Sequence, residues 1–228
     1  MKKFSDILEK LAYTHSRSIV FDDFLQMAVC ALSLGTQEEL DFQTIKKYEA
    51  TDLQKFAEAF ALLVAEMDND GEGLRDCLGD YFQEYISGGH NGQFFTPEAI
   101  CEMMAKITIP ESLETGKTVA DCACGSGRTL LAAAKVNRYL KFYAADVSLT
   151  CCLMTLINLC LNNLEGTVNW MDSLSLKMWG QWVIEKNCLG VCGIYKIEIV
   201  QPVIFDIKPA DEPKPRTDST QLLLDFVA

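Results

Sequence analysis

A glycine-rich turn is the part of this sequence best suited to binding a small molecule. It runs from Asp121 to Gly127, after the apolar residues 118–120 and before a helical pattern over 128–136. Glycines let the backbone turn sharply and approach a ligand closely, and free amides at the start of a helix favour an anionic or electron-rich group. The turn therefore predicts a ligand site, with a tight structural turn as the open alternative.

A carboxylate stands where a nucleotide site would need one. Asp146 ends the second apolar strand, 19 residues past Gly127, about where an acidic residue holds ribose hydroxyls in nucleotide-binding sheets. The dinucleotide motif G-x-G-x-x-G is incomplete, because its third glycine position is Leu130, and the Gly-Lys-Ser/Thr of a P-loop is absent. The turn and Asp146 together are the strongest chemical signal that spacing alone provides.

Alternating strands and helices must position these residues. Short apolar strands over 118–120, 141–145 and 167–171 alternate with helical patterns over 128–136 and 149–161. This βαβαβ order predicts an α/β fold with a parallel sheet and helices packed on its faces. Alternating apolar and charged residues from Tyr195 to Ile199 predict one more half-buried strand.

The first third of the chain is predicted to be helical. Three apolar stripes recur at helical spacing, formed by Phe4, Ile7, Leu8 and Leu11, by Phe21, Phe24, Leu25 and Leu32, and by Leu53, Phe56, Phe60, Leu63 and Met67. The segment 68–73 resembles a calcium loop, but its twelfth position is Gly79 instead of a bidentate carboxylate, which favours a helix-ending polar loop. We expect a helical region over 1–89, a ligand-binding domain over 90–200 and a flexible proline-rich tail over 201–228.

Charge and composition exclude several classes of protein. The net charge of −12 has the wrong sign for a protein that binds nucleic acid on its own, so any DNA contact would need a basic partner. No stretch approaches the roughly 20 apolar residues of a membrane helix, and no signal-peptide core follows Met1. We therefore expect a cytoplasmic protein that is not bound to a membrane. The ten cysteines form no C-x-x-C pair and only two histidines accompany them, so we expect reduced thiols and no metal.

Three motifs in order resemble one enzyme family. They are the segments 76–85, Gly92-Gln93-Phe94-Phe95-Thr96-Pro97, and Asp121-Cys122-Ala123-Cys124-Gly125-Ser126-Gly127. Over about Asp76 to Asp172 the chain resembles the adenine-specific (N6) DNA methyltransferases, and it is most similar to the modification subunit of type I restriction-modification systems. The family usually has proline at the position of Cys122. The resemblance implies a Rossmann-like domain with S-adenosylmethionine as cofactor, and a basic specificity-type subunit as the route to DNA.

The resemblance also implies a role for particular residues. A segment closing over the methionine end of the cofactor matches Phe94, Phe95, Thr96 and Pro97, and the loop beneath it matches Asp121, Gly125, Ser126 and Gly127. Asp146 matches the residue on the ribose hydroxyls, Val147 would pack near the adenine ring, and Asp172 matches the residue that reads the cofactor's adenine amino group. Taken one at a time, these residues also have structural explanations. Phe94 and Phe95 could belong to the core, Thr96-Pro97 could begin a helix, and Asp172 could be a turn residue. Asn158 matches a family asparagine, and a helix-to-sheet contact explains it equally well.

The catalytic motif of the family is missing. Family members flip adenine out of DNA and hold its amine with Asn or Asp, Pro-Pro and an aromatic residue after the fourth strand. This chain has no Pro-Pro, and Phe205-Asp206-Ile207, which echoes that strand, is followed by Lys208-Pro209. About 30 residues between Asp172 and the tail are too few for four more strands with crossovers, which predicts a truncated sheet.

Three functions therefore remain open. The chain is a methyltransferase whose catalytic clamp is diverged or supplied by another subunit, a non-catalytic sensor or decoy that binds S-adenosylmethionine, or an interaction module that occupies the place of a modification subunit. The tail adds a separate hypothesis. Gln221, Leu224 and Phe226 fit a Gln-x-x-Leu-x-Phe pattern that resembles peptides binding the bacterial DNA sliding clamp, although an apolar terminus that packs back on the domain fits too.

Overall fold

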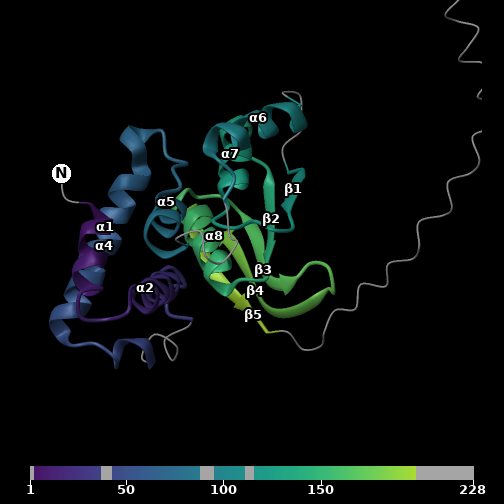
Figure 1. Cartoon of the computed structure of the whole chain (residues 1–228). Coiled ribbons are helices and arrows are strands. Elements are labelled where there is room, and N and C mark those ends of the chain that lie inside the picture. Colours follow the sequence, from purple (N-terminus) through teal and green to yellow (C-terminus); the bar gives the residue numbers. More distant parts are fainter. Residues whose placement is uncertain (1–2, 37–42, 88–94, 111–115, 199–228) are drawn as a thin grey trace, which may run out of the picture.

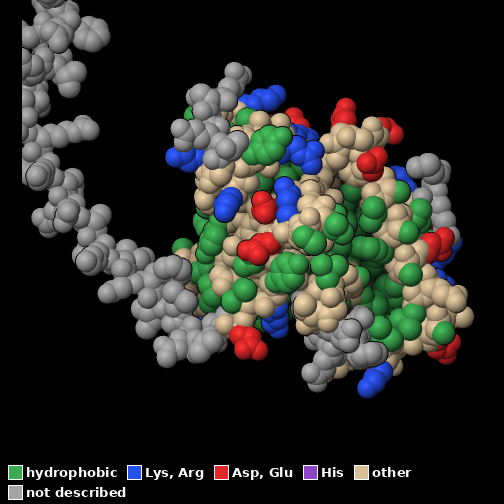
Figure 2. Space-filling model, turned by 180° about the vertical axis from the view of Figure 1, so that it is seen from behind, with side chains coloured by type: hydrophobic (Ala, Val, Ile, Leu, Met, Phe, Trp, Pro, Cys, Tyr) green, Lys and Arg blue, Asp and Glu red, His purple; other side chains and the backbone are tan. Residues whose placement is uncertain are grey.

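The computed structural model describes residues 3–36, 43–87, 95–110 and 116–198. A group of helices lies on one side of a twisted sheet, and a central helix, α8, lies between the two (Figure 1). Seen from behind, hydrophobic side chains are most concentrated on the helical half of the molecule (Figure 2). Phe94 and the predicted tail over 201–228 lie outside the described residues.

The helical region confirms the three predicted stripes. Its elements are α1 (Phe4–Leu11), α2 (Arg17–Leu32), α4 (Ala50–Asp68), the 3₁₀ turn η1 (Asn69–Gly71), α5 (Cys77–Tyr81) and the π-helical η2 (Phe82–Ser87). All four apolar residues of the first stripe are buried, because α1 packs lengthwise against α4. The polar segment after α4 ends that helix as expected: the Asp68 carboxylate accepts the Gly71 N–H at 3.1 Å.

The sheet confirms the α/β fold class. Its strands are β1 (Thr118–Asp121), β2 (Lys141–Asp146), β3 (Gly166–Asp172), β4 (Lys177–Lys186) and β5 (Cys192–Ile197), in the spatial order β1-β2-β3-β4-β5. The first three strands are parallel and are joined by α7 (Arg128–Val136) and α8 (Leu149–Leu161), which is the predicted βαβαβ unit. Helix α6 (Glu98–Thr108) packs beside α7.

The second half of the sheet differs from the prediction. The stretch after Asp172, to which the sequence analysis assigned no element, forms β4, and the last strand begins at Cys192 instead of Tyr195. Both strands are antiparallel to their neighbours, so hairpins replace crossover helices. Gly180 interrupts the apolar alternation of β4, and the reason is steric: a β-carbon there would lie 3.0 Å from the Trp182 ring.

One continuous core joins the two regions. It runs from α1 through α2, α7 and α8 to the sheet. Every residue of α8 from Cys151 to Cys160 is buried, because α2 covers one side of this helix and the strands cover the other. A helix that is apolar all round is expected in such a position. Within the described residues, no helix is long and apolar enough to cross a membrane.

Candidate functional site

The glycine-rich turn needs both of its glycines. Gly125 and Gly127 have left-handed φ angles of 55° and 82°, a conformation that side-chain-bearing residues rarely adopt. A β-carbon on Gly125 would lie 2.9 Å from the Phe95 ring, and one on Gly127 would lie 3.0 Å from the Thr155 hydroxyl oxygen. The turn therefore brings its backbone against Phe95 on one side and against α8 on the other.

Asp146 is tied directly to this turn. One carboxylate oxygen accepts the Gly125 N–H at 2.9 Å, and the other accepts the Ser148 N–H at 2.8 Å. Burial raises the pKa of Asp146 above its usual value, although these backbone hydrogen bonds oppose the shift. Each oxygen of a carboxylate has two lone pairs, so both retain capacity for a further donor. The two elements that sequence spacing linked thus meet at the carboxyl end of the parallel strands.

Several predicted residues line one small pocket at this end. A cavity of about 210 Å³ is bounded by Phe95, Thr96, Asp121, Gly125 and Ser126, together with Cys101, Met104 and Arg128. Gly127 lies at the N-cap of α7, and Pro97 is an exposed N-cap residue of α6. The structure therefore brings together most residues of the first two predicted groups.

Asp121 is held in place by the turn that follows it. Its carboxylate accepts the Ala123 N–H at 3.0 Å and the Thr129 hydroxyl. Thr129 belongs to the first turn of α7, so Asp121 connects the end of β1 to the start of that helix. The carboxylate nevertheless lines the pocket, where it can meet a ligand.

A buried polar network beneath the turn was missed by sequence reasoning. The Asp76 carboxylate accepts hydrogen bonds from Arg128 Nε, Asn158 Nδ2, Ser126 Oγ and the Gly79 N–H, at 2.5–2.9 Å. Burial acts to lower the pKa of Arg128, but the charge of Asp76, its hydrogen bond to the guanidinium and the charge of Asp80 together outweigh burial, and the pKa is raised. The residues at 76 and 128 are far apart in the sequence, and the signal that could have found Asp76 was its place in the motif 76–85.

Asn158 takes part in the same network. Its amide also donates to the Ser126 carbonyl at 2.8 Å, and its side chain is fully buried. The asparagine thus joins α8 to the glycine-rich turn and to Asp76, and not to the sheet as the alternative explanation had it.

Asp172 and Val147 lie near the same end of the sheet. Asp172 accepts hydrogen bonds from the Ser175 hydroxyl and from the N–H groups of Leu174 and Ser175, and these bonds lower its pKa. It therefore stabilises the β3–β4 turn, as its alternative interpretation proposed. The turn reaches the glycine-rich segment, because the Ser173 hydroxyl donates to the Cys122 carbonyl at 2.7 Å. Val147 is 63% exposed and its side chain is free to contact a ligand.

The buried cysteines are unreactive thiols. All ten cysteines are free, and eight are buried. Burial raises the pKa of Cys77, Cys151 and Cys160 to about 12, which keeps them protonated at neutral pH.

Fold and site together define a Rossmann-like α/β domain with a small pocket at the carboxyl end of its parallel strands. Comparison with known proteins gives the family. Residues 75–186 match the model of the N-6 DNA methylases, and through this segment the chain belongs to that family. The chain is also 30% identical, over 152 residues, to the type I restriction enzyme MpnII methylase subunit of Mycoplasma pneumoniae.

The extent of these matches is limited. The alignment covers 60% of this chain, and the chain spans about a quarter, 27%, of that methylase subunit. No solved structure matches the chain.

Proposed function

We propose that the chain binds S-adenosylmethionine at the carboxyl ends of β1, β2 and β3. The observation that carries the proposal is the hydrogen bond from the Gly125 N–H to Asp146, which unites the glycine-rich turn with the acidic residue beside an open pocket. Membership of a DNA methylase family supports this choice of ligand over other nucleotides. Bound there, the cofactor would supply an electrophilic methyl group.

The proposed contacts are those that the family resemblance implies, and the positions of the described residues support them. Phe95 and Thr96, with the neighbouring Phe94 and Pro97, would close over the methionine end, and the turn of Asp121, Gly125, Ser126 and Gly127 would lie beneath it. Asp146 would accept the ribose hydroxyls, and the exposed Val147 would pack against adenine. Asp172 would reach the adenine amine from the β3–β4 turn, where its carboxylate oxygens already accept three hydrogen bonds.

We further propose a role in N6-adenine DNA methylation of the restriction-modification type that depends on a partner. The proposal rests on this sequence lacking an Asn/Asp-Pro-Pro-aromatic segment, the part that would position the adenine amine, which a partner would then supply. A net charge of −12 would leave DNA contacts to a basic, specificity-type subunit in the cytoplasm. The second candidate is a non-catalytic sensor or decoy, that is, a pseudoenzyme, and the missing Asn/Asp-Pro-Pro-aromatic segment favours it. The third candidate is an interaction module that occupies the place of a modification subunit.

Calorimetric titration of the full chain with S-adenosylmethionine tests the binding. We expect saturable binding at one site, with S-adenosylhomocysteine as a competitor and ATP as a control that produces no heat. A methyl-transfer assay on unmethylated DNA with the same sample then separates enzyme from sensor: we expect no transfer by the chain alone. Absence of any cofactor binding would leave only the interaction module.

We also propose that the terminal segment binds the DNA sliding clamp through Gln221, Leu224 and Phe226, which lie outside the described residues. The Gln-x-x-Leu-x-Phe pattern, which follows a proline-rich segment, supports this proposal. A tail peptide is expected to be retained on immobilised clamp, and a peptide with Gln221→Ala and Phe226→Ala to pass through. Equal retention of both peptides would exclude a specific motif.

A further inference from the structure

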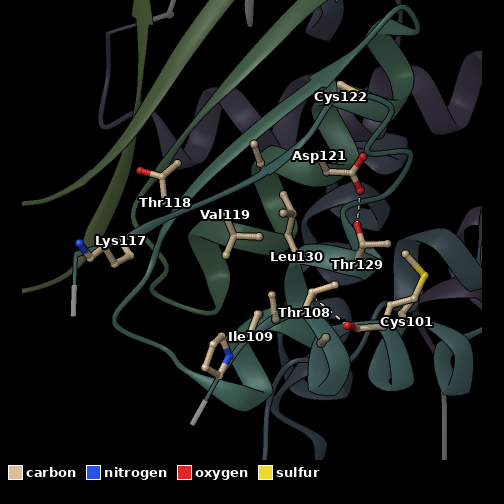
Figure 3. Close-up of a pocket in the computed structure, with 15 residues that line it drawn as sticks. Cys101, Thr108, Ile109, Lys117, Thr118, Val119, Asp121, Cys122, Thr129 and Leu130 are labelled. Atoms are coloured by element: carbon tan, nitrogen blue, oxygen red, sulfur yellow. Dashed lines mark hydrogen bonds between the residues drawn. The ribbon is translucent and has the colours of Figure 1, made fainter. Parts of the chain in front are cut away.

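The segment at the end of β2 carries two of the proposed cofactor contacts. Asp146 would accept the ribose hydroxyls and Val147 would pack against adenine, so both depend on the orientation of the backbone here. At the end of β1, the neighbouring helix fixes the corresponding carboxylate, because the Thr129 hydroxyl of α7 donates to Asp121 (Figure 3). Val147 is 63% exposed, so contacts of its own side chain do little to hold it. The end of β2 therefore needs a support of another kind.

One peptide group in this segment is held from both sides. The Val147 carbonyl accepts the indole N–H of Trp170 at 3.0 Å. The N–H of the same peptide belongs to Ser148 and donates to the Asp146 carboxylate at 2.8 Å. A peptide group is planar, so its C=O and N–H turn together. Rotation of this peptide would break both hydrogen bonds and would change the orientation of Val147 and of the Asp146 carboxylate.

The two neighbouring strands fix the Trp170 side chain. On one side, Trp170 is in register with Asp146 of β2, so its indole begins beside the segment that it contacts. On the other side, the register with β4 shifts just after Trp170, and Trp179 is the extra residue of a β-bulge. The two tryptophan rings lie against each other, with 5.5 Å between their centroids. Bulges re-aim side chains and are common beside active sites. Trp179 thus limits the orientations of the indole that donates to Val147.

We infer that Trp170 is a positioning residue of the proposed cofactor site. Its indole N–H holds the peptide between Val147 and Ser148, and this sets the orientation of Val147 toward adenine and of Asp146 toward the ribose. Trp170 acts through these residues and needs no contact with the cofactor itself. The inference rests on the proposed function for the identity of the ligand, whereas the hold on the peptide is a property of the free chain.

Trp170→Phe tests this hydrogen bond, because phenylalanine keeps an aromatic ring beside Trp179 and has no N–H. In the full chain without ligand, we expect hydrogen exchange of the Ser148 amide, followed by NMR, to become at least fivefold faster, beyond any change in the buried amides of β2. Calorimetric titration of the same variant is expected to show an affinity for S-adenosylmethionine that is about threefold to tenfold lower, the contribution of one neutral hydrogen bond.

A shortened ligand separates the adenine end from the methionine end. 5′-Methylthioadenosine keeps the adenine and the ribose but lacks the amino-acid group, and Trp170→Phe is expected to weaken its binding by the same factor. The effect of Trp170→Phe on affinity is expected to become smaller once Val147→Ala has removed the side chain that would pack on adenine. Residues that act through one another are not additive, whereas a general loosening of the sheet would add in full.

Trp182→Phe is the matched control. It is the same substitution on β4, at a side chain that is 5% exposed and whose N–H has no hydrogen-bond partner among the described residues. It is expected to lower the stability of the core, because a large buried ring becomes smaller. The Ser148 exchange rate, corrected for that loss, and the affinity for S-adenosylmethionine are expected to stay unchanged.

Three results would overturn the inference. They are an unchanged Ser148 exchange rate in Trp170→Phe, equal losses of affinity in Trp170→Phe and Trp182→Phe, and a loss for S-adenosylmethionine that 5′-methylthioadenosine does not share. The original chain reports the proposed function. No binding by that chain would overturn the proposed function and this inference with it, whereas binding that Trp170→Phe leaves unchanged would overturn this inference alone.

Discussion

Asp146→Ala is expected to abolish measurable binding of S-adenosylmethionine. The substitution removes the proposed acceptor of the ribose hydroxyls, and a hydrogen bond to a charged group contributes about 1.5–3 kcal/mol, or roughly tenfold to 150-fold in affinity. It also frees the Gly125 N–H that the carboxylate holds at 2.9 Å, so the turn beneath the cofactor loses its anchor. The lost ribose contact and the loosened turn both lower the affinity for S-adenosylmethionine. Calorimetric titration measures the result.

Asp146→Asn separates the two effects. The asparagine retains a carbonyl oxygen for the Gly125 N–H but has no charge, so we expect an affinity between those of the original chain and Asp146→Ala. Asp52→Asn serves as a control at an acidic residue of α4, which holds Lys55 at 2.9 Å and does not line the pocket, and is expected to leave the affinity unchanged. Unchanged affinity of Asp146→Ala would contradict the assignment of the site.

Asp76→Ala is expected to destabilise the fold by about 3–5 kcal/mol, because it leaves the Arg128 guanidinium without its buried carboxylate partner. Both side chains are nearly inaccessible, with 5% and 11% exposure, and the ion pair spans 2.8 Å. Ser126 and Asn158 lose an acceptor at the same time. Urea denaturation at neutral pH gives the free energy of unfolding.

Asp80→Ala is the matched control on the same arginine. Asp80 also pairs with Arg128, at 2.7 Å, but its side chain is 57% exposed. Screening by water limits such a pair to about 0–1 kcal/mol, so a small loss is expected. Comparable losses for Asp76→Ala and Asp80→Ala would contradict the central role of Asp76. The double change Asp76→Leu with Arg128→Met is expected to recover part of the stability, because no buried charge is left unpaired.

The sequence by itself determined the parallel strands, the helices that join them and the glycine-rich turn. The bounds of α7 and α8 match the predicted 128–136 and 149–161, and the apolar stripe of α1 is buried as expected. These features are local, because hydrophobic periodicity and glycine placement depend on neighbours within a few residues. The pairing of Asp146 with the glycine-rich turn was accessible too, since parallel strands with a crossover bring both to one edge.

Only the tertiary structure decided which residues act together. Asp76 meets Arg128 and Asn158, which lie 52 and 82 positions away, and no short-range pattern encodes such contacts. Strand β4 was missed because Gly180 breaks its apolar alternation, a requirement set by the packing of a tryptophan on the same strand. The contact of Trp170 with Val147 likewise depends on strand order, which arises from long-range pairing. Side-chain spacing records the neighbours along the chain, whereas contacts across the fold are set when the elements pack.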